Sequence, residues 1–379
     1  MWLSQNLKRD AEPTATVLAD GPTVNVDDGW YLLTSTGKRP LFAWVKGSPV
    51  TLGDKSDTPV LTKTIVSDGK PADHAVVGVV EPIQYRLAVT VPATIELYTA
   101  YPLSVHDAWD SMLLPAGKEV SVALVSGRDK RDVSSHAKIA MGEGSLDVSI
   151  DLIAAGAKPG DTLEIAYGLT LAKDALPGYA GAGNDAYATF PSHDGNGKTP
   201  AQTVRAYAVS GSIRLVDGSG KPLANGRFAV RAKDGRWLAQ DGSFGAEAKM
   251  GVWSTGKDGC TPQLPAFAPG EYELVQVEAP EGYAIPHGGV YPFTLVVAVE
   301  DDQLLIEATI SDPCTVLDVN AQTGTYVLQA VNTKQLIPGL LGVMPQTGDI
   351  PWMLATGGLV VTGFVLILVG KRARDGRRG

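Results

Sequence analysis

The feature that most constrains the fold is a period of two in the apolar residues along the middle of the chain. In residues 86–91, Leu87, Val89 and Val91 fall on one face of an extended segment. Clusters of Gly, Pro and Asp separate runs of this kind, and such spacing is typical of strands joined by turns. We therefore predict an all-β protein of tandem immunoglobulin-like β-sandwiches. Further runs of this type lie at 94–98, 120–125 and 162–167.

Three elements follow one another at the C-terminal end. The pentapeptide consists of Met344, Pro345, Gln346, Thr347 and Gly348. Residues 350–370 then form an uncharged apolar run, and residues 371–379 are mostly basic. A run of this length fits a helix that crosses a bilayer core of about 30 Å, and a basic flank stays in the cytoplasm. We expect one transmembrane helix over 350–370, a cytoplasmic tail over 371–379 and the remainder outside the cell.

The order of these elements resembles the cell-wall sorting signal of Gram-positive surface proteins, Leu-Pro-x-Thr-Gly followed by an apolar helix and a basic tail. Met344 replaces the Leu, with little change in volume or polarity. The resemblance implies that a sortase cleaves between Thr347 and Gly348. Its Cys thiolate attacks the Thr347 carbonyl, and an amine of peptidoglycan or of another subunit takes over the acyl group. An ordinary single-pass membrane protein is the alternative. Residues 337–349 form the linker and sorting motif.

Charge and cysteine content agree with an extracellular protein. The net charge is −9 although the tail is basic, so the rest of the chain is acidic and unsuited to nucleic acid. The two cysteines, Cys260 and Cys314, are expected to form a disulfide outside the cell; two unpaired buried thiols are the alternative. Residues 1–13 lack the apolar region of a signal peptide. We expect a truncated chain or a misplaced start.

The part of the chain over residues 209–336 is predicted to be one sandwich with a recognisable motif. Residues 272–283, Tyr-Glu-Leu-Val-Gln-Val-Glu-Ala-Pro-Glu-Gly-Tyr, resemble the E-box of collagen-adhesin B-type domains, which are common in pilins. Residues 211–217 followed by 220–223 resemble the first hairpin of such domains, and residues 326–332 resemble their last strand. The resemblance implies a prealbumin-like β-sandwich.

Domains of this kind often contain a self-made isopeptide bond between a Lys and an Asn. A buried Lys loses its proton more easily, its amine attacks the Asn carbonyl, and a buried carboxyl moves the protons as ammonia leaves. Asn332 stands at the Asn position, but Leu215 replaces the Lys and Gln276 replaces the E-box Glu. We predict no isopeptide bond in residues 209–336.

Residues 57–208 resemble the middle domain of pilin backbone subunits. The matching segments are 59–66, 84–87, 98–107 and 184–187. The resemblance implies Lys63 as nucleophile, Asp107 as acid and Asn184 as acceptor of an isopeptide bond. The end of the family pattern departs here, because Phe-Pro-Ser-His at 190–193 replaces a Tyr-Ser-Asn-like run. The alternatives are a surface Lys63 on an edge strand and a turn or cap role for Asp107.

Residues 1–56 are predicted to be the remnant of an N-terminal pilin domain, because 29–33 resemble the Gly-Tyr-Tyr-Leu segment that ends the family's first domain. Lys55 lies just before the middle domain, where the family often places the lysine that accepts the next subunit. An ordinary solvated lysine is the alternative.

Together these features predict a fimbrial structural subunit that is anchored to the cell wall and serves adhesion. Its partners would be a sortase, peptidoglycan or other pilin subunits, and transiently the membrane. We expect no enzyme activity, no cofactor and no metal site, since the five His residues show no ligand spacing. Two alternatives remain: a monomeric wall-anchored adhesin, and a wall-anchored enzyme with its catalytic domain upstream.

Overall fold

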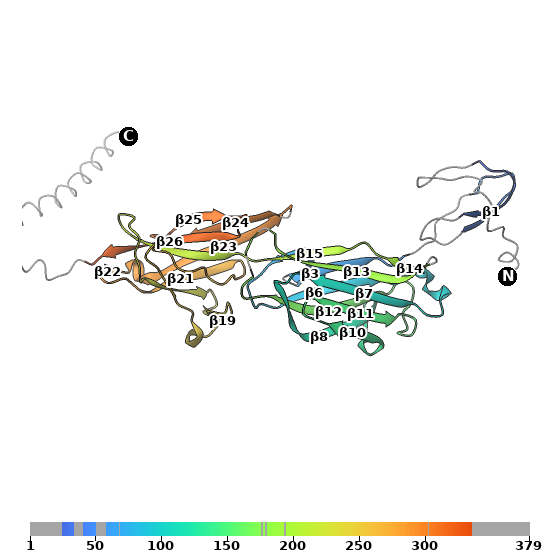
Figure 1. Ribbon diagram of the computed structural model, residues 1–379, viewed down its shortest axis with the longest axis horizontal. Coiled ribbons are helices and arrows are strands. Elements are labelled where there is room, and N and C mark those ends of the chain that lie inside the picture. The colour runs from blue at the N-terminus through green and yellow to red at the C-terminus, as the bar shows by residue number, and fades with distance from the viewer. Residues whose placement is uncertain are drawn as a thin grey trace, which may run out of the picture. The chain divides into compact units, whose positions relative to one another are not determined.

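The computed structural model describes residues 25–33, 41–50, 58–67, 69–175, 177–178, 180–192, 195–301 and 303–335. These residues form β-strands and short 3-10 helices, which confirms the prediction of an all-β protein for this part of the chain (Figure 1). By contacts the described residues divide into two units, one formed by those between 25 and 280 together with those between 285 and 332, and a small one formed by 281–284 with 333–335.

Several predicted elements lie outside the described residues. These are Lys55, the linker and sorting motif over 337–349, the membrane segment 350–370 and the tail 371–379. Within the described ranges, no helix has the length and apolar character needed to cross a bilayer.

Near the N-terminus a two-stranded hairpin pairs β1 (Gly29–Leu33) with β2 (Leu41–Val45) in antiparallel fashion. Trp30 and Trp44 lie opposite each other in this pairing, with ring centroids 5.2 Å apart. Both indoles remain exposed, so the ring contact stabilises the hairpin without closing a core.

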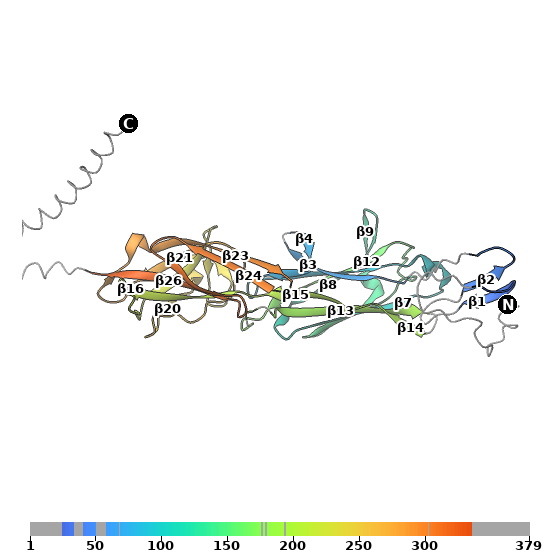
Figure 2. The ribbon, with the colours of Figure 1, turned by 90° about the horizontal axis from the view of Figure 1, so that it is seen from above.

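The strands from residue 61 to residue 207 form two facing sheets, seen as two layers in Figure 2. The first has the order β4-β3-β6-β12-β8-β9. Its strands are β3 (Leu61–Ser67), β4 (Lys70–Ala72), β6 (Ile83–Thr90), β8 (Leu113–Ser126), β9 (Asp129–Asp132) and β12 (Thr162–Leu171). The second has the order β10-β11-β7-β13-β15-β5, with β14 beside β13. Its strands are β5 (His74–Val76), β7 (Pro102–Trp109), β10 (Ala137–Met141), β11 (Ser145–Asp151), β13 (Ala182–Ser192), β14 (Gly195–Lys198) and β15 (Gln202–Tyr207). Two 3-10 helices, η1 (Ala93–Leu97) and η2 (Ser134–His136), lie in the connections.

The core of this first sandwich follows from the alternation in its strands. β6 buries every second residue, including Tyr85, Leu87 and Val89, and β12 does the same with Leu163 and Ile165. Opposite faces of a strand alternate, so one face of each sheet is apolar and packs against the other sheet. This is the arrangement that the period of two predicts, except at 94–98, where the structure has a 3-10 helix over Ala93–Leu97 in place of the predicted strand.

The strands from residue 210 to residue 334 form a second pair of sheets. In one, β26 (Thr325–Lys334) lies between β16 (Ser210–Asp217) and β22 (Tyr283–Ala284) and also pairs with β25 (Thr315–Asn320). The other has the order β19-β18-β17-β21-β23-β24, with β20 beside β17. Its strands are β17 (Arg227–Ala232), β18 (Trp237–Leu238), β19 (Phe244–Gly245), β20 (Trp253–Ser254), β21 (Gly270–Glu278), β23 (Val290–Glu300) and β24 (Gln303–Ile310). Two 3-10 helices, η3 (Glu247–Lys249) and η4 (Pro286–Gly289), lie between strands.

Two features position the motifs of the second sandwich. The E-box segment begins within β21, so Gln276 is directed into the core. β16 and β26, the first and last strands here, are parallel neighbours paired over eight positions from Ser210↔Thr325 to Asp217↔Asn332. Aromatic rings fill the interior beside them, with Phe267 and Tyr272 at a centroid distance of 4.7 Å.

Candidate isopeptide site

Lys63 occupies an inward-facing position of β3. The strand places Leu61, Lys63 and Ile65 on its buried face and Thr62 on the other. The Lys63 side chain is fully buried. An amine in an apolar core requires a charge or hydrogen-bond partner, because desolvating it alone costs several kcal/mol. The alternative of a surface lysine on an edge strand is therefore wrong.

Asp107 and Asn184 come from the facing sheet. Asp107 lies in β7 on the same inner face as Val105 and Trp109, so it is not a turn or cap residue. Asn184 is fully buried in β13. In the antiparallel pairing of these strands, Asp107 is opposite Ala186 and Asn184 is opposite Trp109. The two polar side chains are thus diagonal neighbours on one face, within reach of each other.

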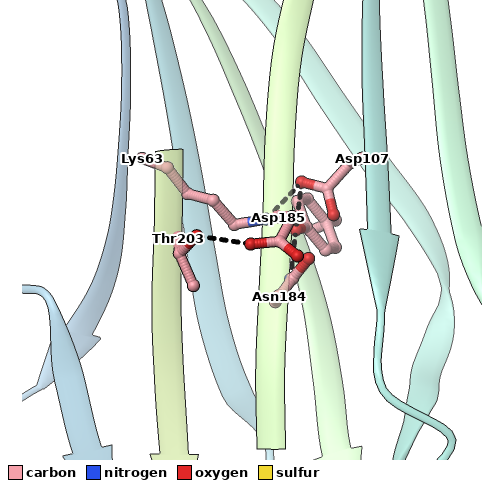
Figure 3. Close-up of polar contacts among 6 residues, drawn as sticks. Lys63, Asp107, Asn184, Asp185 and Thr203 are labelled. Atoms are coloured by element: carbon pink, nitrogen blue, oxygen red, sulfur yellow. Dashed lines mark hydrogen bonds and ion pairs between the residues drawn. The ribbon is translucent and has the colours of Figure 1, made fainter. Parts of the chain in front are cut away.

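A chain of hydrogen bonds joins the three predicted residues through a fourth, Tyr167 of β12. Lys63 Nζ donates to Asp107 Oδ2 at 2.7 Å, and the Tyr167 hydroxyl donates to the same oxygen at 2.7 Å. Asn184 Nδ2 in turn donates to the Tyr167 hydroxyl at 2.9 Å. Figure 3 shows Lys63 extending from its strand toward Asp107 and Asn184. Two members come from each sheet, so the network spans the sandwich.

Two buried oxygens in this network have no hydrogen-bond partner among the described residues: Oδ1 of Asp107 and Oδ1 of Asn184. Buried polar atoms are rarely left unpaired, and both of these are acceptors when the carboxyl is ionised. A proton on the Asp107 carboxyl would add a hydrogen-bond donor to a network that leaves these two acceptor oxygens unpaired.

Burial drives the acid and the amine toward their neutral forms. Desolvation lowers the pKa of Lys63 from 10.5 to about 8, against the opposing charge and hydrogen bond of Asp107. Desolvation raises the pKa of Asp107, against the opposing effects of Lys63 and of the hydrogen bond from Tyr167. A neutral amine is a nucleophile, and a neutral carboxyl is an acid. The site thus holds both groups that amide exchange needs.

Asp185 and its partner Thr203 lie beside the network (Figure 3). Thr203 donates a hydrogen bond to the carboxylate of Asp185, which is exposed. The negative charge of Asp185 raises the pKa of both Lys63 and Asp107, but it is the smallest of the causes acting on each group. Asp185 therefore changes the pKa of Lys63 and of Asp107 slightly without being part of their hydrogen-bond chain.

Aromatic rings surround the amine and the amide. Tyr85 stacks on Tyr167 with centroids 5.4 Å apart, and Trp109 stacks on Tyr167 at 6.1 Å. Lys63 Nζ lies 5.8 Å from the centroid of Tyr85. Burial raises the pKa of both tyrosines, so each phenol keeps its proton. The rings exclude water, and electrostatic interactions are stronger in such surroundings.

Tyr167 is the member that the sequence reasoning missed. The run at 162–167 is predicted as a strand, and its alternation places Leu163, Ile165 and Tyr167 on one buried face. A buried tyrosine normally has a hydrogen-bond partner for its hydroxyl, so the predicted burial of Tyr167 is the signal that it belongs to a polar contact. Local pattern does not reveal which polar group lies opposite, because that depends on how the two sheets face each other.

The corresponding position in the second sandwich holds no amine. Leu215, Gln276 and Asn332 are all buried there, and the amides of Gln276 and Asn332 are hydrogen-bonded to each other. Among the described residues no cluster of His, Cys, Asp and Glu could hold a metal ion.

The structure contradicts the predicted disulfide, because it leaves Cys260 and Cys314 as free thiols. Cys260 is partly exposed, and its backbone pairs with that of Arg214 of β16 in a single antiparallel β-bridge. Cys314 is buried in the turn between β24 and β25. β16 and β26 lie between the segment of Cys260 and the strand that follows Cys314. Cysteine count and compartment do not reveal this separation.

The fold has counterparts among known proteins. Residues 210–313 match the family SpaA, a prealbumin-like fold domain. The pilus 2b backbone protein of group B streptococcus is similar over 72% of this chain and 98% of its own, with 17% identity and a TM-score of 0.52. The C-terminal fragment of the major pilin GBS80 of Streptococcus agalactiae is similar over 73% and 100%, with 16% identity and a TM-score of 0.52.

A third solved structure is the full-length major pilin SpaD from Corynebacterium diphtheriae. It is similar over 83% of this chain and 75% of its own, with 15% identity and a TM-score of 0.52. No curated protein matches the sequence significantly. The chain therefore contains a prealbumin-like SpaA domain over residues 210–313 and shares the all-β fold of Gram-positive backbone pilins.

Proposed function

We propose that the chain is a structural pilin subunit of a Gram-positive cell surface, and that its first sandwich is locked by an isopeptide bond between Lys63 and Asn184. One observation carries the proposal: a buried lysine, carboxyl and asparagine are connected by hydrogen bonds between the two sheets. The fold shared with backbone pilins and the sorting-like C-terminus support it.

The bond would form without any added reagent. The neutral Lys63 amine attacks Cγ of Asn184, and the new C–N bond places a negative charge on Oδ1. Asp107 gives its proton to the departing Nδ2 and takes in exchange the proton that the attacking nitrogen releases. The Cγ–Nδ2 bond then breaks and ammonia leaves. One amine and one primary amide become one secondary amide and one ammonia, so atoms and charges balance.

The mass of the full chain tests this reaction. We expect a single loss of about 17 Da, located in a cross-linked peptide that contains Lys63 and Asn184. Asp107→Asn keeps the shape of the side chain but removes the acid, and we expect its mass to be unshifted. A wild-type chain with unshifted mass would exclude the bond. A second loss of the same size would contradict the prediction for residues 209–336.

The sorting motif would supply the second covalent link. A sortase would cleave between Thr347 and Gly348 and pass the Thr347 acyl group to peptidoglycan or to Lys55 of the next subunit. Cell-wall extracts of wild type, Thr347→Ala and Lys55→Ala strains, probed with antibody to residues 57–336, distinguish the outcomes. A high-mass ladder lost in both variants supports a polymerising pilin. A single wall-linked band lost only in Thr347→Ala indicates a monomeric adhesin instead.

A further inference from the structure

The proton path to the leaving nitrogen is the least obvious part of the proposed reaction. Asp107 touches the nucleophile directly, since Lys63 Nζ lies 2.7 Å from its Oδ2. The leaving nitrogen makes its hydrogen bond to a different group: Asn184 Nδ2 donates to the hydroxyl of Tyr167. That hydroxyl donates in turn to Asp107 Oδ2. The acid and the leaving group are thus connected by one phenol.

We infer that Tyr167 is a catalytic residue of this reaction, which carries a proton from Asp107 Oδ2 to Nδ2 of Asn184. The inference rests on the proposed isopeptide bond and adds a fourth reacting group to it. As Cγ–Nδ2 breaks, the phenol gives its proton to Nδ2 and takes the proton of Asp107, which the proton released by Lys63 then replaces. The hydroxyl is restored in the same step, so no phenolate accumulates and no co-reactant is needed.

Burial supports a relay rather than an anionic base. Tyr167 is almost fully buried, and burial together with the nearby Asp107 raises its pKa above the ordinary value. A phenol that resists ionisation can still pass protons if it receives one while it gives one. Asp185 offers no competing path, because it is exposed and accepts its hydrogen bond from Thr203.

Tyr85 provides a matched control. It stacks on Tyr167 and is equally buried, but its hydroxyl has no hydrogen-bond partner among the described residues. Tyr85→Phe and Tyr167→Phe therefore remove the same atom from neighbouring rings. Only the second change interrupts the path between Asp107 and Asn184.

The test is a time course of bond formation in the full chain. The wild type, Tyr85→Phe and Tyr167→Phe chains are made by cell-free synthesis. Samples are denatured at intervals, and their masses are measured by mass spectrometry. We expect Tyr167→Phe to slow the loss of ammonia by about 100-fold or more, as for removal of a general acid. Tyr85→Phe should form the bond at nearly the wild-type rate. Equal rates for wild type and Tyr167→Phe would overturn the relay but not the bond.

A second measurement separates proton transfer from positioning. Fluorotyrosine installed at position 167 makes the phenol more acidic while it keeps the ring and hydroxyl in place. A relay predicts that the rate changes with phenol acidity and shows a solvent deuterium effect larger than that of Tyr167→Phe. A rate unchanged by fluorination would overturn the relay, even if Tyr167→Phe fails to fold. Absence of mass loss in the wild type would instead reject the proposed bond itself.

Discussion

Gln276 and Asn332 are joined by both of their side-chain amides: Gln276 Nε2 donates to Asn332 Oδ1 at 2.8 Å, and Asn332 Nδ2 donates to Gln276 Oε1 at 2.8 Å. Both residues are buried, and Asn332 is fully so. Each amide satisfies the other, so two polar groups fit in an apolar core without water. The pair connects β21 of one sheet with β26 of the other.

This reciprocity predicts a strong coupling between the two residues. Asn332→Leu or Gln276→Met alone leaves one buried amide unpaired and should lower the free energy of unfolding by about 2 kcal/mol. The double variant removes both polar groups and should cost clearly less than the two single changes together. Urea unfolding of the four chains measures this coupling. Additive effects would show that the two amides do not depend on each other.

Loss of the proposed cross-link should lower thermal stability. The bond between Lys63 and Asn184 closes a loop of about 120 residues, for which chain entropy predicts a stabilisation of about 5 kcal/mol. We expect Lys63→Met to lower the Tm of the first sandwich by roughly 10 to 20 °C. Scanning calorimetry measures the change. Lys70→Met, the same substitution at an exposed position of β4, is the control and should have little effect.

Blocking the bond should expose a pH dependence that the linked protein lacks. In Asn184→Ala the Lys63 amine stays free, with a pKa of about 8 when folded against 10.5 when unfolded. Between these values the unfolded chain binds more protons, so stability rises with pH. Below pH 8 the folded chain bears the full free-energy cost of burying the charged Lys63, and above pH 10.5 this cost vanishes because the amine is neutral in both states. From pH 7.5 to 9.5 we expect a gain of about 2 kcal/mol.

Urea titrations at the two pH values measure this gain. The wild type has an amide in place of the amine and should not share it. Asn184→Ala with Lys63→Met should also lack it, since that chain has no amine to titrate at this position. An equal rise in all three chains would assign the effect to other groups.

The two cysteines should differ in reactivity. Cys260 is partly exposed and should react with a maleimide in the folded protein. Cys314 is buried, and burial raises the pKa of its thiol to about 12, so little reactive thiolate is present. Mass spectrometry should find one label per native chain and two after denaturation. Labelling that requires a reducing agent would favour the disulfide over the free thiols.

Much of the first site was predictable because each residue stands on the apolar face of a strand. Lys63 falls between Leu61 and Ile65, and Asp107 follows Leu103 and Val105 at the same spacing. A charged residue on the buried face of a strand needs a partner, and the local alternation shows which charged residues fall on that face. The resemblance to pilin domains added Asn184, which carries no charge and would not be noticed by this criterion.

Tyr167 and the free thiols depend on long-range pairing. Tyr167 meets Asn184 only because β12 and β13, which belong to facing sheets, bring these two side chains together, and no local period encodes that alignment. Cysteine count and compartment predict that Cys260 pairs with Cys314, whereas the bridge to β16 and the turn before β25 decide where the thiols lie. Sequence pattern thus predicts which face a residue occupies better than which residue it meets.

The parallel pairing of β16 with β26 has a mechanical consequence. Tension along the chain would enter this sandwich near Ser210 and leave it near the end of β26, so the two strands would be pulled in opposite directions along their shared axis. All eight paired positions would then resist together in shear, rather than opening one after another as in a zipper. In the sandwich that lacks a lysine for a covalent bond, resistance to stretching would rest on this ladder.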